Sequence, residues 1–213
     1  MPDYSTIYRR VSAFVPEFEQ SLADLGDEVV IAVDSSGIKV TNKGEWIRGQ
    51  GKRKRKGYLK IHIAVDVKTK QILTLEVTDE RVGDSDRFES LVEGARRVAN
   101  VVKALGDGAY DSKEAYEYLE AKRVAAGIRP RSNSSGKARG CWPRMRAVRE
   151  FLKDEKRWSR KVGYGKRRMV ESTLSSFKRT FGEFASAKKF SNMVQEMKLK
   201  AFTYNLLISL SRC

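Results

Sequence analysis

The chain has 213 residues and a formal net charge of +16, from 43 Lys and Arg against 27 Asp and Glu, and its 40% hydrophobic content suffices for one sizeable domain with a core. No apolar stretch reaches the roughly 20 residues that cross a bilayer, no signal peptide is recognisable, and Cys141 and Cys213 lack the spacing of zinc ligands. We therefore expect a cytoplasmic protein whose partner is a polyanion, by default nucleic acid, and not a membrane.

Residues 1–27 are predicted to form a helical segment that precedes the main domain at 28–213. Within residues 2–20, Tyr4, Ile7, Val11 and Phe14 recur at helical spacing. We interpret this segment as one amphipathic packing helix, and the alternative is the last helix of a helix-turn-helix.

Several strands are predicted next. Residues 28–34 are apolar on both alternating faces, as expected of a central strand covered by helices on each side, and they end in Asp34. Residues 38–40 are predicted to form a short second strand, and residues 58–65 and 72–77 two longer ones joined by a Lys-Thr-Lys turn. Together the strands predict a three-strand antiparallel meander.

The pattern then changes to helix from residue 85, followed by a short apolar strand at 101–105. A strand, a helix and a strand imply a crossover and a parallel pair. Further helices are predicted at about 144–156, 166–181 and 191–210. The predicted fold class is therefore α/β, with a mixed sheet flanked by helices.

Four polar residues are interpreted as helix caps. Ser112 and Asp111 precede an apolar helical pattern, and Asp84 and Asp86 precede the helix that begins near residue 85. Each is a residue type that commonly accepts a hydrogen bond from the first turn of a helix.

Two carboxylates follow apolar strands. Asp34 and Asp107 each stand where such a strand is predicted to end, and ligand sites of open α/β sheets gather outside the carboxyl ends of strands. If the two strands are neighbours, the carboxylates converge. Because Mg²⁺ prefers oxygen ligands, a third carboxylate nearby would complete a site for divalent ions.

The helix at 166–181 supplies the third carboxylate, Glu171. At about 100° per residue, Arg167, Glu171 and Lys178 fall on one stripe of this helix, beside an apolar stripe that can pack. Glu171 can then face metal ions while Arg167 orients it or grips a phosphate, and Lys178 can contact the DNA backbone.

These residues also resemble a known family. The spacing of Tyr164, Arg167, Glu171 and Lys178 is similar to the Y-R-E-K signature of DDE transposases in the IS-four and IS-five groups of insertion sequences. The segments around Asp34 and Asp107 resemble those around the first and second Asp of that family, and the resemblance extends over about residues 28–210.

The resemblance implies an RNase H-like catalytic domain and an enzyme that cleaves DNA at insertion-sequence ends and transfers the strand into target DNA. It implies Asp34, Asp107 and Glu171 as catalytic residues and ligands of Mg²⁺ or Mn²⁺, with two ions expected. It also implies double-stranded DNA as the partner, contacts to DNA from Tyr164 and its signature neighbours, and a homodimer assembled on DNA.

Residues outside the signature allow more than one interpretation. A run of five cations is either a solvated hairpin tip or, as we favour, a contact to the DNA backbone: Lys52, Arg53, Lys54, Arg55 and Lys56. His62, the one histidine, is interpreted as a packed core residue. Trp142 and Trp158 either stack on an unpaired base or pack in the core.

Two alternative functions remain open at the level of sequence. The N-terminal region is shorter than is common in the resembled family, where it recognises the ends of the element. The chain could therefore be a non-catalytic DNA-binding remnant of a transposase. It could also be a structure-specific nuclease of the same fold that hydrolyses DNA without joining strands.

Overall fold

The computed structural model describes residues 3–14, 18–40, 58–137 and 140–211. The strands are β1 (Val29–Val40), β2 (Tyr58–Asp66), β3 (Ile72–Asp79), β4 (Val101–Gly106), β5 (Ala125–Ile128) and β6 (Phe184–Ala185). The α-helices are α1 (Tyr4–Ala13), α3 (Phe88–Val98), α4 (Lys113–Ala121), α5 (Trp142–Lys153), α6 (Glu155–Val162), α7 (Arg168–Phe181) and α8 (Phe190–Leu210). Short 3-10 turns are η1 (Phe18–Ser21), η2 (Ser85–Arg87), η3 (Gly108–Tyr110) and η4 (Tyr164–Arg167).

These strands form one mixed sheet in the order β3-β2-β1-β4-β5, with β6 paired to the end of β1. β1, β2 and β3 are antiparallel, which confirms the predicted meander. β4 lies parallel to β1 on its other side, as the crossover through α3 predicted, and β5 continues the parallel half. The predicted mixed α/β fold is therefore confirmed.

β1 differs from its prediction because it does not end at Asp34. The prediction of two strands separated by Ser35-Ser36-Gly37 is wrong: those three residues pair with His62, Ile61 and Lys60 of β2, and β1 runs on unbroken to Val40. Small and polar residues resemble a turn locally, but a long antiparallel partner keeps their backbone extended. Asp34 therefore lies in the middle of a strand.

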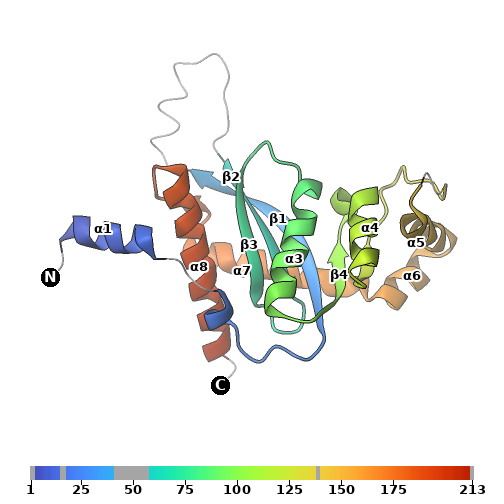
Figure 1. The fold of residues 1–213 in the computed structure, drawn as a ribbon, viewed down its shortest axis with the longest axis horizontal. Coiled ribbons are helices and arrows are strands. Elements are labelled where there is room, and N and C mark those ends of the chain that lie inside the picture. Colours follow the sequence, from blue (N-terminus) through green and yellow to red (C-terminus); the bar gives the residue numbers. More distant parts are fainter. Residues whose placement is uncertain (1–2, 15–17, 41–57, 138–139, 212–213) are drawn as a thin grey trace, which may run out of the picture.

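Helices cover both faces of the sheet, with α3 and α4 on one side and α7 on the other (Figure 1), and an apolar core lies between the sheet and the helices on each side. Along β1, Ile31 and Val33 pack with the α3 and α4 side, whereas Ala32 and Ile38 pack with the α7 and α8 side. Since side chains alternate along a strand, Asp34 shares the α7 face with Ala32.

The segment after α4 differs most from its prediction. Neither β5 nor β6 has a separate signal in the sequence, and the single helix expected at 144–156 is two helices, α5 and α6. The break is at Asp154, whose Oδ1 accepts a hydrogen bond from Arg157 N at 2.9 Å and so caps α6.

The N-terminal helix is shorter than expected and ends at Ala13. It extends away from the sheet in Figure 1. Phe14, just after it, contacts Phe202 of α8 edge to face, with ring centroids 6.5 Å apart. Among the described residues, no helix combines the length and the apolar character that a bilayer crossing requires.

Candidate active site

Three acidic side chains come together from separate elements on the α7 face of the sheet. The parallel register between β1 and β4 pairs Ala32 with Leu105, so two further residues bring Asp34 level with Asp107, which directly follows β4. Asp34 and Asp107 are each two residues after a side chain that packs towards α7, Ala32 and Leu105, so they are on the same face of the sheet. Glu171 lies in the first turn of α7, which contacts β1.

Arg167 joins all three carboxylates. Its Nη1 lies 2.6 Å from Glu171 Oε1, and its Nη2 lies 3.3 Å from Asp34 Oδ2 and 3.4 Å from Asp107 Oδ2. Arg167 immediately precedes α7, one turn before Glu171, as the predicted stripe required. The convergence expected from sequence is therefore present, with a guanidinium at its centre.

The local backbone fixes the two aspartates. Asp34 Oδ1 accepts a hydrogen bond from Ser35 N at 2.8 Å, and Asp107 Oδ1 accepts one from Ala109 N at 2.9 Å. In each case one carboxylate oxygen is held by the protein and the other, Oδ2, faces Arg167. Such hydrogen bonds orient the carboxylates before any ligand binds.

The electrostatics of this cluster favour a bound cation. Burial raises the pKa of Asp34, and the neighbouring negative charges of Asp107 and Glu171 raise it further, against the Ser35 N–H and the Arg167 guanidinium, which lower it. Burial by itself would lower the pKa of Arg167, but the surrounding carboxylates hold it above its usual range. The cluster thus concentrates negative charge that Arg167 partly neutralises.

A hollow of about 510 Å³ opens beside these carboxylates. It is lined by Asp34, Ser35, Ser36, Glu171, Leu174, Ser175, Lys178, Arg179 and Glu183. Lys178, two turns after Glu171 on α7, is therefore in the same hollow as two of the carboxylates. The side chains that line it combine hydroxyls and cations, which are groups that bind phosphate oxygens.

The remaining predicted DNA contacts are placed differently. Tyr164 begins η4, and its ring packs on Trp158 with centroids 5.3 Å apart, while burial raises the pKa of its hydroxyl. Trp158 is buried, and Trp142 is exposed. The run Lys52–Lys56 lies outside the described residues.

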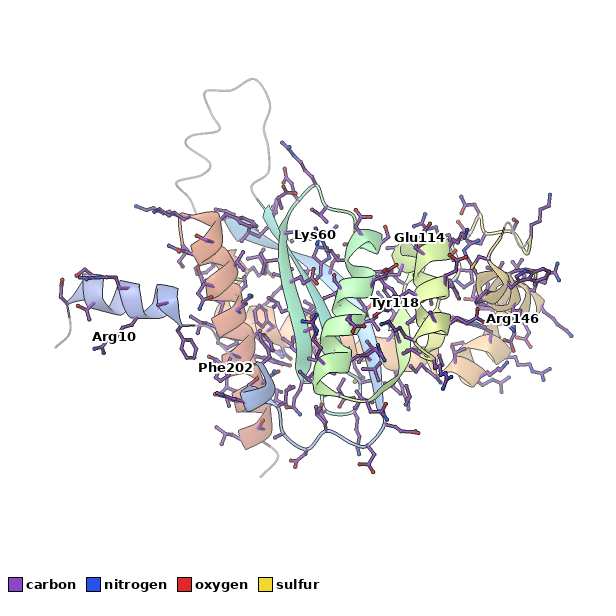
Figure 2. All side chains as sticks on the ribbon, viewed as in Figure 1. Arg10, Lys60, Glu114, Tyr118, Arg146 and Phe202 are labelled. Carbon is purple, nitrogen blue, oxygen red and sulfur yellow. The ribbon has the colours of Figure 1, made fainter. Side chains whose placement is uncertain are left out.

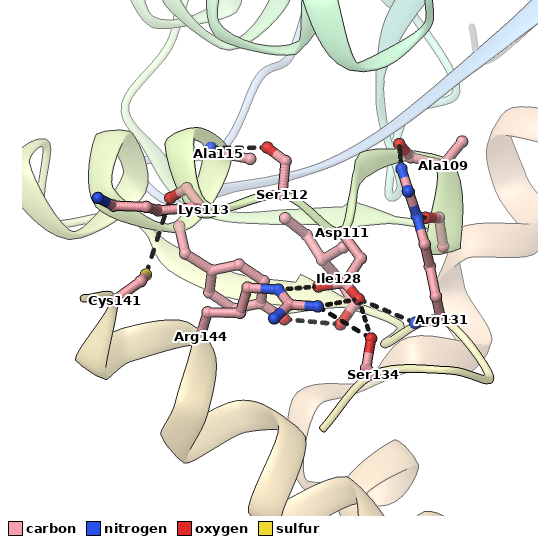
Figure 3. A network of polar contacts seen from close by, with 12 residues as sticks. Ala109, Asp111, Ser112, Lys113, Ala115, Ile128, Arg131, Ser134, Cys141 and Arg144 are labelled. Atoms are coloured by element: carbon pink, nitrogen blue, oxygen red, sulfur yellow. Dashed lines mark hydrogen bonds and ion pairs between the residues drawn. The ribbon is translucent and has the colours of Figure 1, made fainter. Parts of the chain in front are cut away.

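Asp111 organises the loop beside Asp107, as Figure 3 shows. Arg144 of α5 binds its carboxylate through two hydrogen bonds, Nε to Oδ1 at 2.7 Å and Nη2 to Oδ2 at 2.8 Å. Ser134 Oγ and Arg131 N also donate to Oδ2, at 2.5 and 2.9 Å. The interpretation of Asp111 as a helix cap is wrong, because Ser112 caps α4 by accepting from Ala115 N at 3.1 Å.

The hydrogen bonds around Asp111 extend to the backbone of the turn that follows Asp107. Arg131 donates from Nε to Gly108 O at 2.6 Å and from Nη2 to Ala109 O at 3.0 Å, directly after Asp107. Burial alone would raise the pKa of Asp111, but the hydrogen bonds from Arg144, Ser134 and Arg131 N hold it below its usual range. Asp111 is therefore an ionised, buried anchor for the turn that carries Asp107.

Asp84 and Asp86 also differ from their prediction as caps. Asp84 makes no side-chain capping bond, and its Oδ1 lies 2.7 Å from Lys60 Nζ and 3.6 Å from His62 Nδ1. Asp86 lies inside η2 rather than before it, and its Oδ1 accepts from Ser85 Oγ at 3.5 Å. Both carboxylates therefore interact with other side chains and do not cap a helix.

His62 agrees with its interpretation as a packed core residue. It is fully buried, with Nε2 2.9 Å from Thr78 Oγ1. Burial lowers the pKa of His62 to about 4. The ring is therefore neutral at pH 7.

The donor set suits a hard divalent cation. Asp34, Asp107 and Glu171 offer oxygen atoms alone, which Mg²⁺ and Mn²⁺ prefer. Among the residues that the structure describes, no group of three or more His, Cys, Asp and Glu side chains lies in an arrangement that could hold a metal ion. The guanidinium of Arg167 lies between the three carboxylates. Its Nε is buried and has no hydrogen-bond partner among the described residues.

The fold and this site define a class of proteins. A mixed sheet of this order, with acidic residues converging on one face and a helix that supplies the third, is an RNase H-like fold. A model of the transposase DDE domain family matches residues 25–206. The chain therefore belongs to the transposase DDE domain family.

A solved transposase structure resembles the chain in fold. The chain is similar to the piggyBac transposase in the cryo-EM structure of its synaptic complex with hairpin DNA, with a TM-score of 0.50 and 11% identity. The match covers 92% of this chain and 49% of that one, so the chain spans about half the length of the piggyBac protein. The Mos1 transposase in its paired-end complex with the left transposon end matches at a TM-score of 0.34 and 10% identity, over 68% of this chain and 55% of that one.

Proposed function

We propose that this chain is the catalytic domain of a DDE transposase that cleaves phosphodiester bonds at the ends of an insertion sequence and joins the freed strand to target DNA. One observation carries the proposal. Asp34, Asp107 and Glu171, which are far apart in the sequence, all lie within 3.4 Å of one guanidinium on the same face of the sheet. The family membership over residues 25–206 supports the same reaction class.

In this proposal Asp34, Asp107 and Glu171 hold two Mg²⁺ or Mn²⁺ ions. When bound, such ions supply an activated water or 3′-hydroxyl on one side of the phosphodiester and stabilise the leaving oxygen on the other. Ser35 N and Ala109 N orient the two aspartates for this task. Because the nucleophile is a water or a DNA hydroxyl, no covalent intermediate on a protein side chain is required.

Arg167 and Lys178 act on the DNA. Arg167 balances the mutual repulsion of the three carboxylates and orients Glu171, and we propose that its guanidinium also contacts a DNA phosphate. Lys178 lies in the hollow beside Asp34 and Glu171, where its ammonium can neutralise a backbone phosphate. Tyr164 acts alongside them by fixing η4 against Trp158.

Duplex DNA is the proposed partner, and a homodimer assembled on DNA is the proposed active form. A net charge of +16 favours a polyanion over a neutral or acidic partner. The relative with a similar fold is a transposase seen in a synaptic complex with hairpin DNA, which supports a nucleic-acid partner for this chain too.

A cleavage assay tests the proposal. The purified chain is incubated with Mg²⁺ or Mn²⁺ and a DNA fragment that carries the sequences flanking its coding region, and Asp34→Asn and Glu171→Gln are compared with wild type. We expect both variants to lose cleavage by at least about a thousandfold, since each removes a charge that holds the ions. Glu114→Gln on α4, an exposed acidic residue away from the cluster, is the matched control and should cleave as wild type does.

The outcomes also separate the two alternatives. If wild type binds DNA but does not cleave it in the presence of metal ions, the chain is a non-catalytic DNA-binding remnant of a transposase. Cleavage without joined product, when a pre-cut end with a free 3′-hydroxyl is supplied, would indicate a nuclease. Undiminished cleavage by both variants would show that Asp34 and Glu171 have no part in the mechanism, and would refute the proposed metal site.

A further inference from the structure

Positive charge is concentrated in one part of the fold. Residues 142–168, which span α5, α6, η4 and the first residue of α7, hold eleven Lys and Arg against three acidic residues, and so half of the net charge of +16. These helices stand at one end of the sheet, and Figure 2 labels Arg146 among their side chains. Of these eleven cations, only Arg167 is among the DNA contacts of the proposed function.

Helix α6 separates its cations from its packing residue. Trp158 is 2% exposed and packs against Phe151 of α5, with ring centroids 5.2 Å apart. On a helix, Arg160 lies four residues after Lys156 and three after Arg157, so the three side chains are on the side of α6 away from Trp158. All three are exposed.

The cations on this face lack acidic partners. Two other exposed cations of α5 and α6 are in ion pairs: Arg146 with Glu120 at 2.7 Å and Lys161 with Glu150 at 2.5 Å. Within the described parts of the chain, Lys156, Arg157 and Arg160 form no ion pair. Adjacent like charges repel, and a polyanion relieves this repulsion.

The basic face is rigidly attached to the candidate active site at three points. Trp158 packs against Tyr164, which begins the turn that ends at Arg167. Lys103 Nζ of β4 donates to Val162 O at the end of α6, at 3.2 Å. Arg144 of α5 binds Asp111 beside the turn that follows Asp107. A ligand held on α6 would therefore keep a fixed position relative to the carboxylates.

A second hollow of the molecule, between α3 and α4, has a mainly acidic lining. This hollow of about 710 Å³ is lined by four acidic residues, Asp86, Glu89, Glu93 and Glu114, with Arg87 and Lys122 as its cations. Figure 2 labels Glu114 and Tyr118 on α4, beside this hollow. Within the described residues, the lining of this hollow is thus more acidic than the exposed face of α6, which favours α6 for an anionic ligand.

We propose that the exposed face of α6, formed by Lys156, Arg157 and Arg160, binds the sugar-phosphate backbone of duplex DNA next to the candidate active site. The identity of the polyanion as DNA rests on the proposed function, whereas the existence of the surface rests on charge and packing. Backbone contacts of this kind position a duplex without reading its sequence. By binding the DNA that flanks the bond to be cleaved, this face would therefore help to place that bond next to Asp34 and Asp107.

Binding measurements on the full chain test this surface. The triple variant Lys156→Gln, Arg157→Gln and Arg160→Gln keeps good helix formers and removes three charges. Fluorescence anisotropy with a short labelled duplex, in a chelator so that no cleavage occurs, gives Kd over a range of salt concentrations. We expect affinity to fall by at least about tenfold near 0.1 M salt, and the salt slope to decrease by about 0.9 for each phosphate that the variant no longer neutralises.

The matched control removes three exposed cations near the C-terminal ends of α3 and α4: Arg97→Gln, Lys122→Gln and Arg123→Gln. We expect this control to bind as wild type does. An unchanged Kd and slope in the α6 variant, an equal weakening in the control, or tighter binding of an RNA duplex than of the DNA would each overturn the proposal. Because binding is measured without divalent ions, its failure leaves the cleavage proposal standing, and failure of the cleavage proposal leaves this binding result interpretable.

Discussion

Arg144 and Arg146 offer a direct test of the anchor beneath Asp107. Both are on α5, and both have an ion pair at 2.7 Å, Arg144 with Asp111 and Arg146 with Glu120. They differ in burial, since the Asp111 side chain is 0% exposed and that of Arg144 22%, against 55% and 67% for Glu120 and Arg146. Arg144→Met should therefore destabilise the chain far more than Arg146→Met.

The expected magnitude follows from what each variant leaves behind. Removing one partner of a buried pair leaves an uncompensated charge and typically costs about 3–5 kcal/mol, whereas an exposed pair contributes less than about 1 kcal/mol. For a chain of this size, the larger loss lowers Tm by about 10 °C. Thermal and urea unfolding, followed by circular dichroism, measure both variants.

Two further comparisons establish the cause of the loss. Without Arg144, Asp111 is a buried carboxyl whose folded pKa should rise above its unfolded value, so the deficit of Arg144→Met should shrink as the pH is lowered towards 4. Adding Asp111→Asn to Arg144→Met removes the unpaired charge and should restore part of the stability. Equal losses from Arg144→Met and Arg146→Met, or no recovery in the double variant, would refute the reasoning.

Two other predictions concern buried polar groups. Burial lowers the pKa of His62 to about 4, with Asp84, Lys60 and Arg87 as its charged neighbours. The unfolded chain therefore takes up a proton at this residue before the folded chain does. The stability that neutral His62 contributes is complete above the unfolded pKa, and the free energy of unfolding falls by about 2 kcal/mol by pH 5. Its lone imidazole resonance should titrate near the lowered value by NMR, and His62→Gln should lose less stability than wild type between pH 7 and pH 5; a titration near pH 6.5 would contradict this. Asn205 of α8 is fully buried and bonds both Ile72 N and Ile72 O at 2.8 Å, so Asn205→Leu should lower the free energy of unfolding by about 3 kcal/mol. Exposed Thr203→Leu on the same helix is its control in urea unfolding, and equal midpoints for the two variants would show that these bonds contribute little.

The sequence predicted the parts of the site that depend on local pattern. Asp107 follows an apolar strand, and Arg167 and Glu171 are one helical turn apart, so strand and helix periodicity suffice to place them. For Asp34 the predicted position is right but the reason is partly wrong. Its strand continues past it, and the parallel partner β4, not β1, is what ends at that level.

Residues that depend on distant partners could not be predicted in the same way. Asp111 and Asp84 resemble caps in sequence, but their partners Arg144 and Lys60 are brought to them by the fold. The short strand β5 has too few residues for a period-two pattern and exists because β4 provides an edge. The role of Trp158 likewise depends on its contacts with other aromatic rings of α5 and η4.

Whether the three carboxylates act as one unit is the most direct test of the proposed metal site. Cleavage rates are compared for Asp34→Asn, Asp107→Asn, Glu171→Gln and the variant that combines all three. Since residues that share one pair of ions fail together, we expect each single substitution to cost as much as the triple one. Losses that instead multiply from one substitution to the next, or a single variant that still cleaves, would contradict a shared metal site.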